Sequence, residues 1–321
     1  MARAPQVVVV GSFNVDHVWT LPSLPRAGET RVGTYRNGPG GKGFNQATAA
    51  ARAGAATAFI CALGDDSGGQ LARRLAGEDG IELRVAHSEA PTGTAGIHVD
   101  REGRNSIVIG PGANALLAAD FVHAQADALA HATVVLAQLE SPVDAVAAAF
   151  ELARGAGALT VLNPAPVDAE LTSSLLALSD VISPNESEFC AQLQRHLGAS
   201  CDPERLVELD DGDLHALSRR LLPHGTVIVT LGAQGCFISH APGRMRGDER
   251  ETYRVAAHAA QVIDTTGAGD AFNGALAASI ACRPRDPFAV HVAFANRYAA
   301  RSTERPGAAS AMPTRDDLRL D

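Results

Sequence analysis

Short apolar runs alternate with polar, glycine-containing segments along the whole chain. In the first third, this pattern predicts strands at 6–10 and 57–63 and helices at 43–53 and 68–76. Beyond residue 118 the alternation becomes regular, with strands predicted at 133–137, 159–162, 180–182, 226–230 and 236–240, and helices at 118–129, 142–156, 170–177, 186–194, 271–281 and 287–300. Strands followed by helices at this spacing are typical of parallel βαβ units, whose helices cover both faces of a sheet.

Two separated segments depart from this rhythm. The first, at 14–38, places prolines and glycines between short alternating stretches, which predicts strands and turns. The second, at 92–112, holds two short strands joined by Asp-Arg-Glu-Gly, a hairpin pattern. Because no repeat or low-complexity linker divides the chain, we expect one α/β domain over 1–321 with a small β excursion built from both segments.

Two polar stretches in the second half are expected at the surface. The acidic segment 195–212 predicts a solvent-exposed insertion, and the arginine-rich segment 242–250 predicts a loop tip.

The composition fits a folded protein and excludes several classes. Of 321 residues, 46% are hydrophobic and 20% are charged, which excludes a disordered chain. The formal charge of −9 is spread over small clusters without a basic stripe, so we expect no nucleic-acid partner. The apolar run at 7–10 is too short for a membrane span or a signal-peptide core, so we expect no membrane association.

The cysteines favour a reducing compartment. They are odd in number and scattered, without a C-x-x-C pair: Cys61, Cys190, Cys201, Cys236 and Cys282. This pattern argues against a disulfide framework and against a zinc site, and we expect a cytoplasmic protein.

The glycine-rich segment 38–43 contains the only lysine of the chain, Lys42. Either chance or a site too narrow for a guanidinium explains why a chain that otherwise uses arginine keeps a lysine here. The segment satisfies the G-x-G-x-x-G pattern, but it does not follow the first strand directly, so NAD binding is a remote alternative. A Walker A loop is excluded, because Gly43 follows the lysine and Arg36 occupies the position of the first glycine.

The segment 262–274 is more informative. We predict a strand that ends at Ile263, then a Gly-Ala-Gly turn and a helix that starts near Asp270. The N–H groups at such a turn, with the positive end of the helix dipole, form an anion-binding site. An aspartate there repels phosphate, yet it is useful if it accepts a proton from the hydroxyl that attacks the phosphate. From the spacing alone, Asp270 is either such a base or a helix cap.

These segments resemble the two signatures of the ribokinase family of sugar kinases, also called the phosphofructokinase-B family. The segments 39–46, 49–54 and 64–66 look like the first signature, and 264–274 looks like the second. Four further segments are similar to ribokinases of this family, at 11–16, 138–142, 163–166 and 183–188. The resemblance covers nearly the whole chain and implies a three-layer α/β/α ribokinase-like fold, with a mostly parallel central sheet and a small β-sheet lid from 14–38 and 92–112.

The resemblance implies an enzyme that transfers the γ-phosphoryl group of ATP, with Mg²⁺, to the 5-hydroxyl of D-ribose. In this interpretation Asp270 is the general base, and the turn before it, with Gly267, Ala268 and Gly269, is the anion hole. A kinase of another small furanose or of a nucleoside is the alternative. A non-catalytic sugar- or nucleotide-binding regulator is more remote, because a pure binding protein has no need of the base. Activation by K⁺ and a homodimer formed through the lids are also implied.

By position, the resemblance assigns further residues to three ligands. The sugar would be held by Asn14, Asp16, Gly40, Gly41, Lys42, Asn45 and Glu140. The nucleotide and its Mg²⁺ would be held by Asn185, Glu188, Thr230, Gly232, Gly235, Gly269 and Asn296. The monovalent cation would be held by Asp264, Thr266, Ser302, Arg305 and Gly307. Carboxylate and amide side chains suit a sugar, because its many hydroxyls need many fixed partners.

Three positions depart from the family pattern. Phe44 stands where a small residue is usual, so its ring narrows the sugar site, stacks on a base or lies in the core. Ala311 stands where a side-chain hydroxyl often contributes to the cation site, with Ser310 beside it. The insertion at 195–212 is longer than usual.

Overall fold

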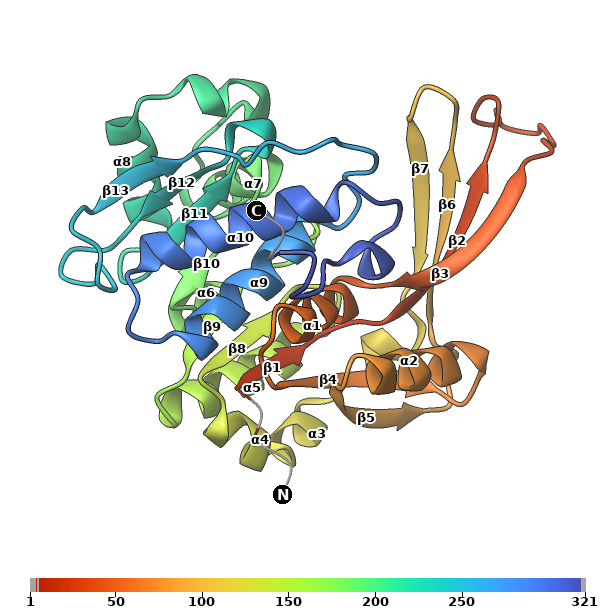
Figure 1. The fold of residues 1–321 in the computed structure, drawn as a ribbon, viewed down its shortest axis with the longest axis horizontal. Helices are drawn as coiled ribbons and strands as arrows, with labels where there is room; N and C mark the ends of the chain where they lie inside the picture. The colour runs from red at the N-terminus through yellow and green to blue at the C-terminus, as the bar shows by residue number, and fades with distance from the viewer. Residues whose placement is uncertain (1–3, 5, 319–321) are drawn as a thin grey trace.

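The computed structural model describes residue 4 and residues 6–318, and its centre is a nine-stranded sheet (Figure 1). In spatial order the strands are β13 (Thr252–Val255), β12 (Cys236–Ser239), β11 (Thr226–Thr230), β10 (Val181–Ile182), β9 (Leu159–Leu162), β8 (Val134–Ala137), β1 (Val7–Val10), β4 (Thr57–Gly64) and β5 (Glu82–Ser88). All neighbouring pairs of this sheet are parallel except the two that include β12. Strands β1 and β8 are buried along their whole length, as expected of parallel strands covered on both faces.

Helices cover both faces of the large sheet. One face packs against α1 (Lys42–Arg52), α2 (Ser67–Glu78), α9 (Ala268–Cys282) and α10 (Phe288–Ser302). The other face packs against α3 (Ala119–His123), α4 (Ala126–His131), α5 (Val143–Gly155), α6 (Ser173–Leu178), α7 (Glu186–Leu197) and α8 (Asp211–Leu221). Val8 and Val10 of β1 belong to one apolar core and Val7 and Val9 to the other, because side chains alternate along a strand. The predicted three-layer fold class is confirmed.

A second, four-stranded sheet projects beyond this core (Figure 1). Its strands, in spatial order, are β3 (Thr34–Gly40), β2 (Asn14–Thr20), β6 (Gly93–Val99) and β7 (Asn105–Gly110). We call it the lid sheet. Asn14, the first residue of β2, pairs with Gly40 on one side and Gly93 on the other, so the start of β2 lies where the lid sheet meets the core.

No helix in the part of the chain that the structure describes is long and apolar enough to cross a membrane. Four short 3₁₀ helices complete the described elements: η1 (Gly112–Leu116), η2 (Pro203–Glu208), η3 (Gly232–Gln234) and η4 (Ala309–Ala311).

Several elements differ from the sequence prediction. The single helix expected at 118–129 is the pair α3 and α4, while β5, α8 and β13 were not predicted at all. The strand expected to end at Ile263 is absent. Val262 and Ile263 are 63% and 66% exposed, in a loop whose backbone bonds to Thr303 rather than to a strand. A β-branched pair favours a strand, but without a neighbouring strand it does not form one.

The segment 195–212 lies largely at the surface, as predicted, but it is folded into the end of α7, the 3₁₀ helix η2 and the start of α8. Helix α7 continues to Leu197 and ends at Gly198, which has a φ of 63°. The 3₁₀ helix η2 follows, and its Leu206 is buried against the core. In a segment of mostly acidic and polar composition, the sequence did not predict that Leu206 is buried.

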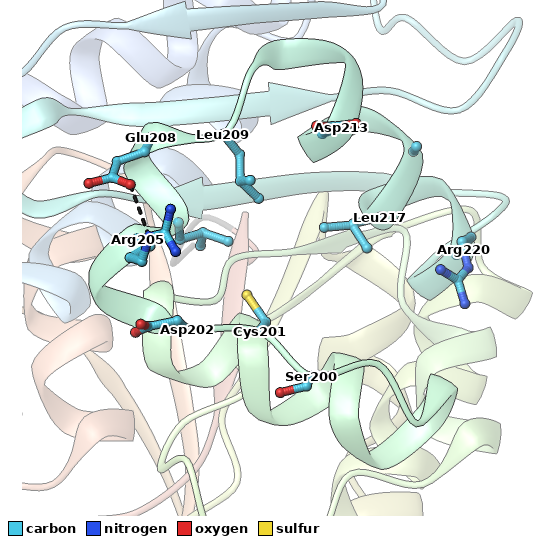
Figure 2. Close-up of a pocket in the computed structure, with 11 residues that line it drawn as sticks. Ser200, Cys201, Asp202, Arg205, Glu208, Leu209, Asp213, Leu217 and Arg220 are labelled. Atoms are coloured by element: carbon cyan, nitrogen blue, oxygen red, sulfur yellow. Dashed lines mark hydrogen bonds and ion pairs between the residues drawn. The ribbon is translucent and has the colours of Figure 1, made fainter.

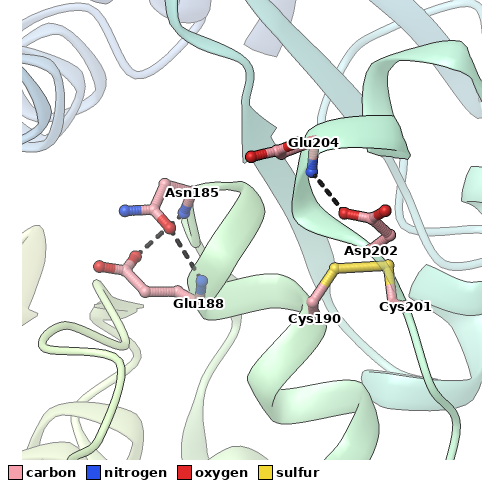
Figure 3. Close-up of a disulfide and its surroundings, with 6 residues drawn as sticks. All are labelled: Asn185, Glu188, Cys190, Cys201, Asp202 and Glu204. Carbon is pink, nitrogen blue, oxygen red and sulfur yellow. Dashed lines mark hydrogen bonds between the residues drawn. A yellow bond between two sulfur atoms is a disulfide. The ribbon is translucent and has the colours of Figure 1, made fainter.

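Cys190 of α7 and Cys201 form a disulfide across this segment, with a Cα–Cα distance of 5.1 Å (Figure 3). The sequence argued against a disulfide framework, and it did not predict this one local pair, which joins residues at a sequence separation of 11. The two cysteines meet because the chain turns back after Gly198, and no spacing rule predicts this turn. Cys61, Cys236 and Cys282 are free.

Candidate active site

Polar side chains gather where the parallel strands of the large sheet end. Gln138 and Glu140 follow β8, and Asn163 follows β9. Asn185 follows β10 and forms an isolated bridge with Thr230 at the end of β11. The carboxyl edge of an open α/β sheet is where such folds bind their ligands. The candidate site therefore begins at this edge.

A cavity of about 170 Å³ lies at the start of α9, and we call it the phosphate cavity. Its wall is formed by Lys42, Asn163, Ala165, Ser183, Asn185, Glu188, Thr230, Thr265, Gly267, Ala268, Gly269, Asp270 and Asn273. Gly267 has a φ of +76°, and a Cβ there would lie 2.9 Å from the Cβ of Ala308, so only glycine fits. The first turn of this 15-residue helix presents N–H groups and positive dipole charge, which suits a phosphate.

Asp270 lies in the first turn of α9 but does not cap it. Its carboxylate instead accepts hydrogen bonds from helix α1: Asn45 Nδ2 donates to Oδ2 and Gln46 Nε2 donates to Oδ1, each at 2.9 Å. The side chain is almost fully buried, and burial raises the pKa of Asp270, while Lys42 and the two amides act in the opposite direction. The helix-cap alternative therefore lacks support, and the carboxylate is held at the phosphate cavity.

Lys42 begins helix α1 and lies among carboxylates. Its backbone N–H donates to Oε2 of Glu140 at 2.9 Å, and the residue lines the phosphate cavity. Burial alone would lower the pKa of Lys42, but the charges of Asp270, Glu140 and Glu188 raise it. A permanently charged ammonium at this cavity offsets part of the repulsion between these carboxylates and an incoming phosphate.

The residues assigned to the sugar lie between the core and the base of the lid sheet. Glu140 accepts from Ser12 Oγ at 2.6 Å, in addition to Lys42 N. Asp16 of β2 lies beside Gly40 of β3. A Cβ atom at Gly40 would lie 2.2 Å from Oδ1 of Asp16, so the glycine leaves room for this carboxylate. Burial and the charge of Glu140 raise the pKa of Asp16 to about 7. The two carboxylates are thus close enough for the charge of Glu140 to act on Asp16, and Asp16 lines a cavity of about 620 Å³.

Asn14 and Asn45 supply amides to the same region. Asn114 of η1 holds Asn14 in place, donating from Nδ2 to Asn14 Oδ1 at 2.8 Å and also bonding the backbone of Phe13. Asn45 Oδ1 is buried without a hydrogen-bond partner among the described residues. Buried polar atoms are nearly always satisfied, so this oxygen is suited to accept from a ligand hydroxyl. Asn114 carries no signal in the sequence that would have marked it.

Phe44 points away from the site. Its ring is 1% exposed and packs edge-on against Phe13, with ring centroids 5.0 Å apart, and against Phe59. The residue is part of the apolar core, so it neither narrows the sugar region nor offers a stacking surface.

Asn185 and Glu188 form a capping box at the start of α7 (Figure 3). Asn185 Oδ1 accepts from Glu188 N at 2.8 Å, and Glu188 Oε2 accepts from Asn185 N at 3.0 Å. Burial raises the pKa of Glu188. Both residues line the phosphate cavity, so a helix cap and a ligand role are compatible here.

Three residues assigned to the nucleotide lie outside the phosphate cavity. Gly232 and Gly235 form the turn after β11, with φ values of 50° and 86°. Asn296 of α10 donates to the backbone carbonyls of Val255 and Ala256, each at 3.3 Å. It lines a separate cavity of about 400 Å³ between α10 and the chain after β13.

The residues assigned to a monovalent cation are only partly brought together. Asp264 accepts from Thr266 N and Gly307 N, each at 2.9 Å, and shares a cavity of about 620 Å³ with Asp16. Ser302 Oγ donates within α10 to Ala299, and Arg305 pairs with Asp317 at 2.6 Å. The Arg305 side chain is therefore engaged elsewhere, and the Ser302 hydroxyl donates its proton within the helix, so the Ser302 oxygen and the backbone carbonyls of both residues remain as ligands.

A cavity of about 660 Å³ lies away from this site, between η2 and α8 (Figure 2). Leu206, Leu209 and Leu217 form its apolar wall, and Arg205 and Arg220 stand at its rim. Arg205 pairs with Glu208 at 3.1 Å. None of the residues assigned to the sugar, the nucleotide or the cation lines this cavity.

Comparison with known proteins gives consistent matches over nearly the whole chain. Residues 4–315 match the model of the family described as pfkB family carbohydrate kinase. The chain is 36% identical to ribokinase from Haemophilus influenzae over 318 residues, 97% of this chain and 96% of that protein. The solved structure of ribokinase from Giardia lamblia superposes with a TM-score of 0.86 at 29% identity, covering 98% of both chains. That of Arabidopsis thaliana ribokinase complexed with ribose and ATP gives 0.82 at 28% identity, also over 98% of both.

Proposed function

Because the chain belongs to the pfkB family of carbohydrate kinases, we propose that it transfers the γ-phosphoryl group of ATP to the 5-hydroxyl of D-ribose. One observation carries the proposal: the buried carboxylate of Asp270 lies at the phosphate cavity and accepts a hydrogen bond from Asn45, one of the residues assigned to the sugar. A single carboxylate thus stands between the place for a sugar and the place for a phosphate. The similarity of the chain to ribokinases, one of them solved with ribose and ATP, supports the choice of substrates.

In the proposed reaction, Asp270 accepts the proton of the sugar 5-hydroxyl as its oxygen attacks the γ-phosphorus. The new P–O bond forms on the sugar while the bond from γ-phosphorus to the bridging oxygen of ADP breaks, and ADP leaves with that electron pair. The N–H groups of Gly267 and Gly269 stabilise the charge on the transferring group, while the N–H of Ala268 donates to the carbonyl of Thr265 at 3.1 Å and holds the turn in shape. The proton passes from Asp270 to solvent after the product leaves.

The nucleotide is proposed to extend from the cavity at Asn296 to the phosphate cavity. Thr230, with Gly232 and Gly235 after it, lies between the two at the end of β11. Glycines in this turn leave the backbone open to a close ligand. The adenine end is then distant from Asp270, and the γ-phosphate is next to it.

Glu188 is suited to hold the Mg²⁺ of the nucleotide. One oxygen of its carboxylate accepts from Asn185 N, and the residue lines the phosphate cavity. Mg²⁺ keeps most of its waters and binds proteins through one or two carboxylates plus phosphate oxygens, so this donor set fits. The ion would neutralise charge on the phosphates during transfer.

A monovalent cation, K⁺ by preference, is proposed to bind at Asp264. The donors would be the Asp264 carboxylate and backbone carbonyls at Thr266, Ser302, Arg305 and Gly307. Ser310 lines the same cavity as Asp264, and a Cβ at Gly307 would lie 2.4 Å from its hydroxyl oxygen. Ser310 can therefore replace the hydroxyl that Ala311 lacks.

We expect K⁺ to raise kcat severalfold. The bound cation orders the loop before α9, and its charge adds a positive field near the transferred phosphoryl group. Ser310→Ala removes one neutral ligand of the cation. We therefore expect it to raise the K⁺ concentration for half-maximal activation by about tenfold or less. A K⁺ titration of both proteins at constant ionic strength measures this. Equal activity with and without K⁺ would reject the site, and an unchanged half-maximal concentration would remove Ser310 from it.

A homodimer formed through the lid sheets is proposed from the exposure of β7. Every residue of this strand is exposed, including Ile107 at 51%, Val108 at 69% and Ile109 at 48%. A contiguous apolar edge strand of this kind is a site of association. We expect light scattering after gel filtration to give twice the chain mass, and Val108→Lys with Ile109→Lys to give one chain mass. A monomeric wild type would contradict the proposal.

A cytoplasmic location is proposed because ATP and free sugar are available there. Cys61, Cys236 and Cys282 are free thiols, which a reducing compartment preserves, and Cys190–Cys201 is the single disulfide among the described residues. Fractionation of the native host would test the location, and recovery outside the cytoplasm would refute it.

The proposed function is tested by incubating the purified chain with ATP, Mg²⁺ and ribose and identifying the product by ³¹P NMR. We expect a primary phosphomonoester coupled to the two C5 protons and an equal amount of ADP. EDTA is expected to stop the reaction. Phosphate on a secondary hydroxyl, or ADP formation that does not depend on sugar, would contradict the proposal.

A further inference from the structure

Two buried glutamines lie behind Asp270 and have no role in the mechanism described above. Gln46 belongs to α1 and Gln138 follows β8, and both are 0% exposed. Buried side-chain amides are mostly hydrogen-bonded, so the partners of these two show what they do; Gln138 Oε1 is the one amide oxygen of the pair without a partner among the described residues.

Gln46 contacts three side chains. Its Nε2 donates to Asp270 Oδ1 at 2.9 Å and to Asn163 Oδ1 at 3.0 Å. Its Oε1 accepts from Gln138 Nε2 at 2.5 Å. Both N–H groups and the carbonyl oxygen are therefore used, and one of the two acceptors is the proposed general base.

The position of Gln138 determines which way the Gln46 amide faces. A flipped amide would place its oxygen against the Asp270 carboxylate and the Asn163 oxygen, and its N–H groups against the donor of Gln138. That arrangement has no satisfied hydrogen bond. Gly11 leaves room for the Gln138 side chain, because a Cβ atom at residue 11 would lie 2.3 Å from Gln138 Oε1.

We infer that Gln46 is a positioning residue for phosphoryl transfer: its amide, oriented by Gln138, holds the Asp270 carboxylate in the ionised, fixed state that accepts the proton. With Asn45 donating to Oδ2 and Gln46 to Oδ1, the carboxylate cannot rotate about its bond to the side chain. The inference rests on the proposed function, because it assumes that Asp270 is the base.

The same amide links the base to the anion hole. Asn163, which accepts from Gln46, donates to the carbonyl of Ser183 at 3.1 Å. Ser183 Oγ donates to Asn273, and Asn273 Nδ2 donates to the carbonyl of Gly269 at 2.9 Å. Base and anion hole thus belong to one hydrogen-bond network, buried except at Gly269, in which the loss of a member affects the others.

The decisive variant is Gln46→Glu, which keeps the shape of the side chain and its acceptor for Gln138. It removes both N–H donors and places a second carboxyl group against Asp270. We expect kcat to fall about 10- to 100-fold at neutral pH, a loss typical of a misplaced catalytic group. The KM for ATP is expected to stay within about twofold, because the nucleotide residues are not touched.

The pH profile separates positioning from a general structural defect. A carboxylate that loses a donor and gains a like charge is protonated more readily, so the acid limb of kcat is expected to move to higher pH in Gln46→Glu. Gln138→Met removes only the donor that orients Gln46, and we expect a smaller shift in the same direction. If Gln46→Glu does not fold, Gln138→Met decides the question.

Gln192→Glu is the matched control. Gln192 is a glutamine of α7 that is also 0% exposed, and its Oε1 accepts from Arg195 at 3.2 Å. This variant carries the same change of charge at a buried site outside the network. We expect it to keep the wild-type kcat and the wild-type acid limb. Melting temperatures of all variants show which of them fold.

Wild-type kcat and pH profile in Gln46→Glu would overturn the inference, and so would a loss that is equal at every pH. The assays use whichever sugar the wild type phosphorylates fastest. If that sugar is not ribose, the proposed substrate fails while the test of Gln46 still stands. If ribose is the best acceptor and the variants behave like wild type, only the inference about Gln46 fails.

Discussion

An Asp270→Asn variant is expected to fold normally and to turn over about 10²- to 10⁴-fold more slowly than the wild type, the usual contribution of a positioned base. Asparagine has nearly the same size as aspartate, and its oxygen can still accept from α1. It cannot take the proton of the attacking hydroxyl. The measurement is kcat at saturating ATP and sugar, followed through ADP release.

The pH dependence of the two proteins gives a second readout. Burial raises the pKa of Asp270, so the acid limb of wild-type kcat is expected above the range of an ordinary exposed carboxyl. As the pH falls through that pKa, the base is protonated and kcat falls. Asp270→Asn has no such group and is expected to lack the limb. Unchanged ATP binding and melting temperature serve as controls, and wild-type turnover in a folded variant would remove Asp270 from the mechanism.

Ribose is expected to exceed 2-deoxyribose in kcat/KM by about 10³-fold, if Asp16 accepts from the 2-hydroxyl. Sites built to bond a hydroxyl reject the analogue that lacks it by roughly 10⁴- to 10⁵-fold when fully enclosed, because a buried partner is left unpaired. Asp16 remains partly exposed, which lowers the expected factor. The comparison uses both sugars with the same enzyme preparation.

Asp16→Ala tests whether this discrimination comes from the carboxylate. We expect the variant to lose activity on ribose and to treat the two sugars within about tenfold of each other. Burial and Glu140 raise the pKa of Asp16 to about 7, so the charged acceptor is fully present only above that pH. The KM for ribose is therefore expected to fall as the pH rises from about 6 to about 8. A preference for ribose that survives in Asp16→Ala would place the 2-hydroxyl elsewhere.

The fold was predictable from sequence where hydrophobic burial alone decides the structure. The apolar run of β1, fully buried in the structure, shows the pattern of a strand covered on both faces. Strand β5 was missed because no residue of it is fully buried at this edge of the sheet, and its alternation of polar and apolar residues breaks down at Val85 and Ala86. Val262 and Ile263 show the opposite error, since a strand-like pair lies in a loop when no strand pairs with it.

The candidate site was predictable as a list of positions but not as a geometry. The motifs predicted that Asp270 and the glycines before it belong to one site, and in the structure these residues line one cavity. The orientation of Phe44 depends on packing against Phe13 and Phe59, which lie apart from it in the chain. The role inferred for Gln46 depends on hydrogen bonds across 92 and 224 residues of sequence, and no local pattern encodes such contacts.

The measurement that tests the central claim most directly is kcat/KM for ribose, 2-deoxyribose, fructose, adenosine and inosine, with ATP, Mg²⁺ and K⁺ in one buffer. The structure buries Phe44 in the core, which leaves no stacking surface at that position for a base, so we expect ribose to be the best acceptor of the five. We expect the nucleosides to be poorer than ribose by about tenfold or more, given the loss of fitted hydroxyl contacts. A nucleoside that exceeds ribose by about tenfold, equivalent to about 1.4 kcal/mol in transition-state binding, would contradict the assignment.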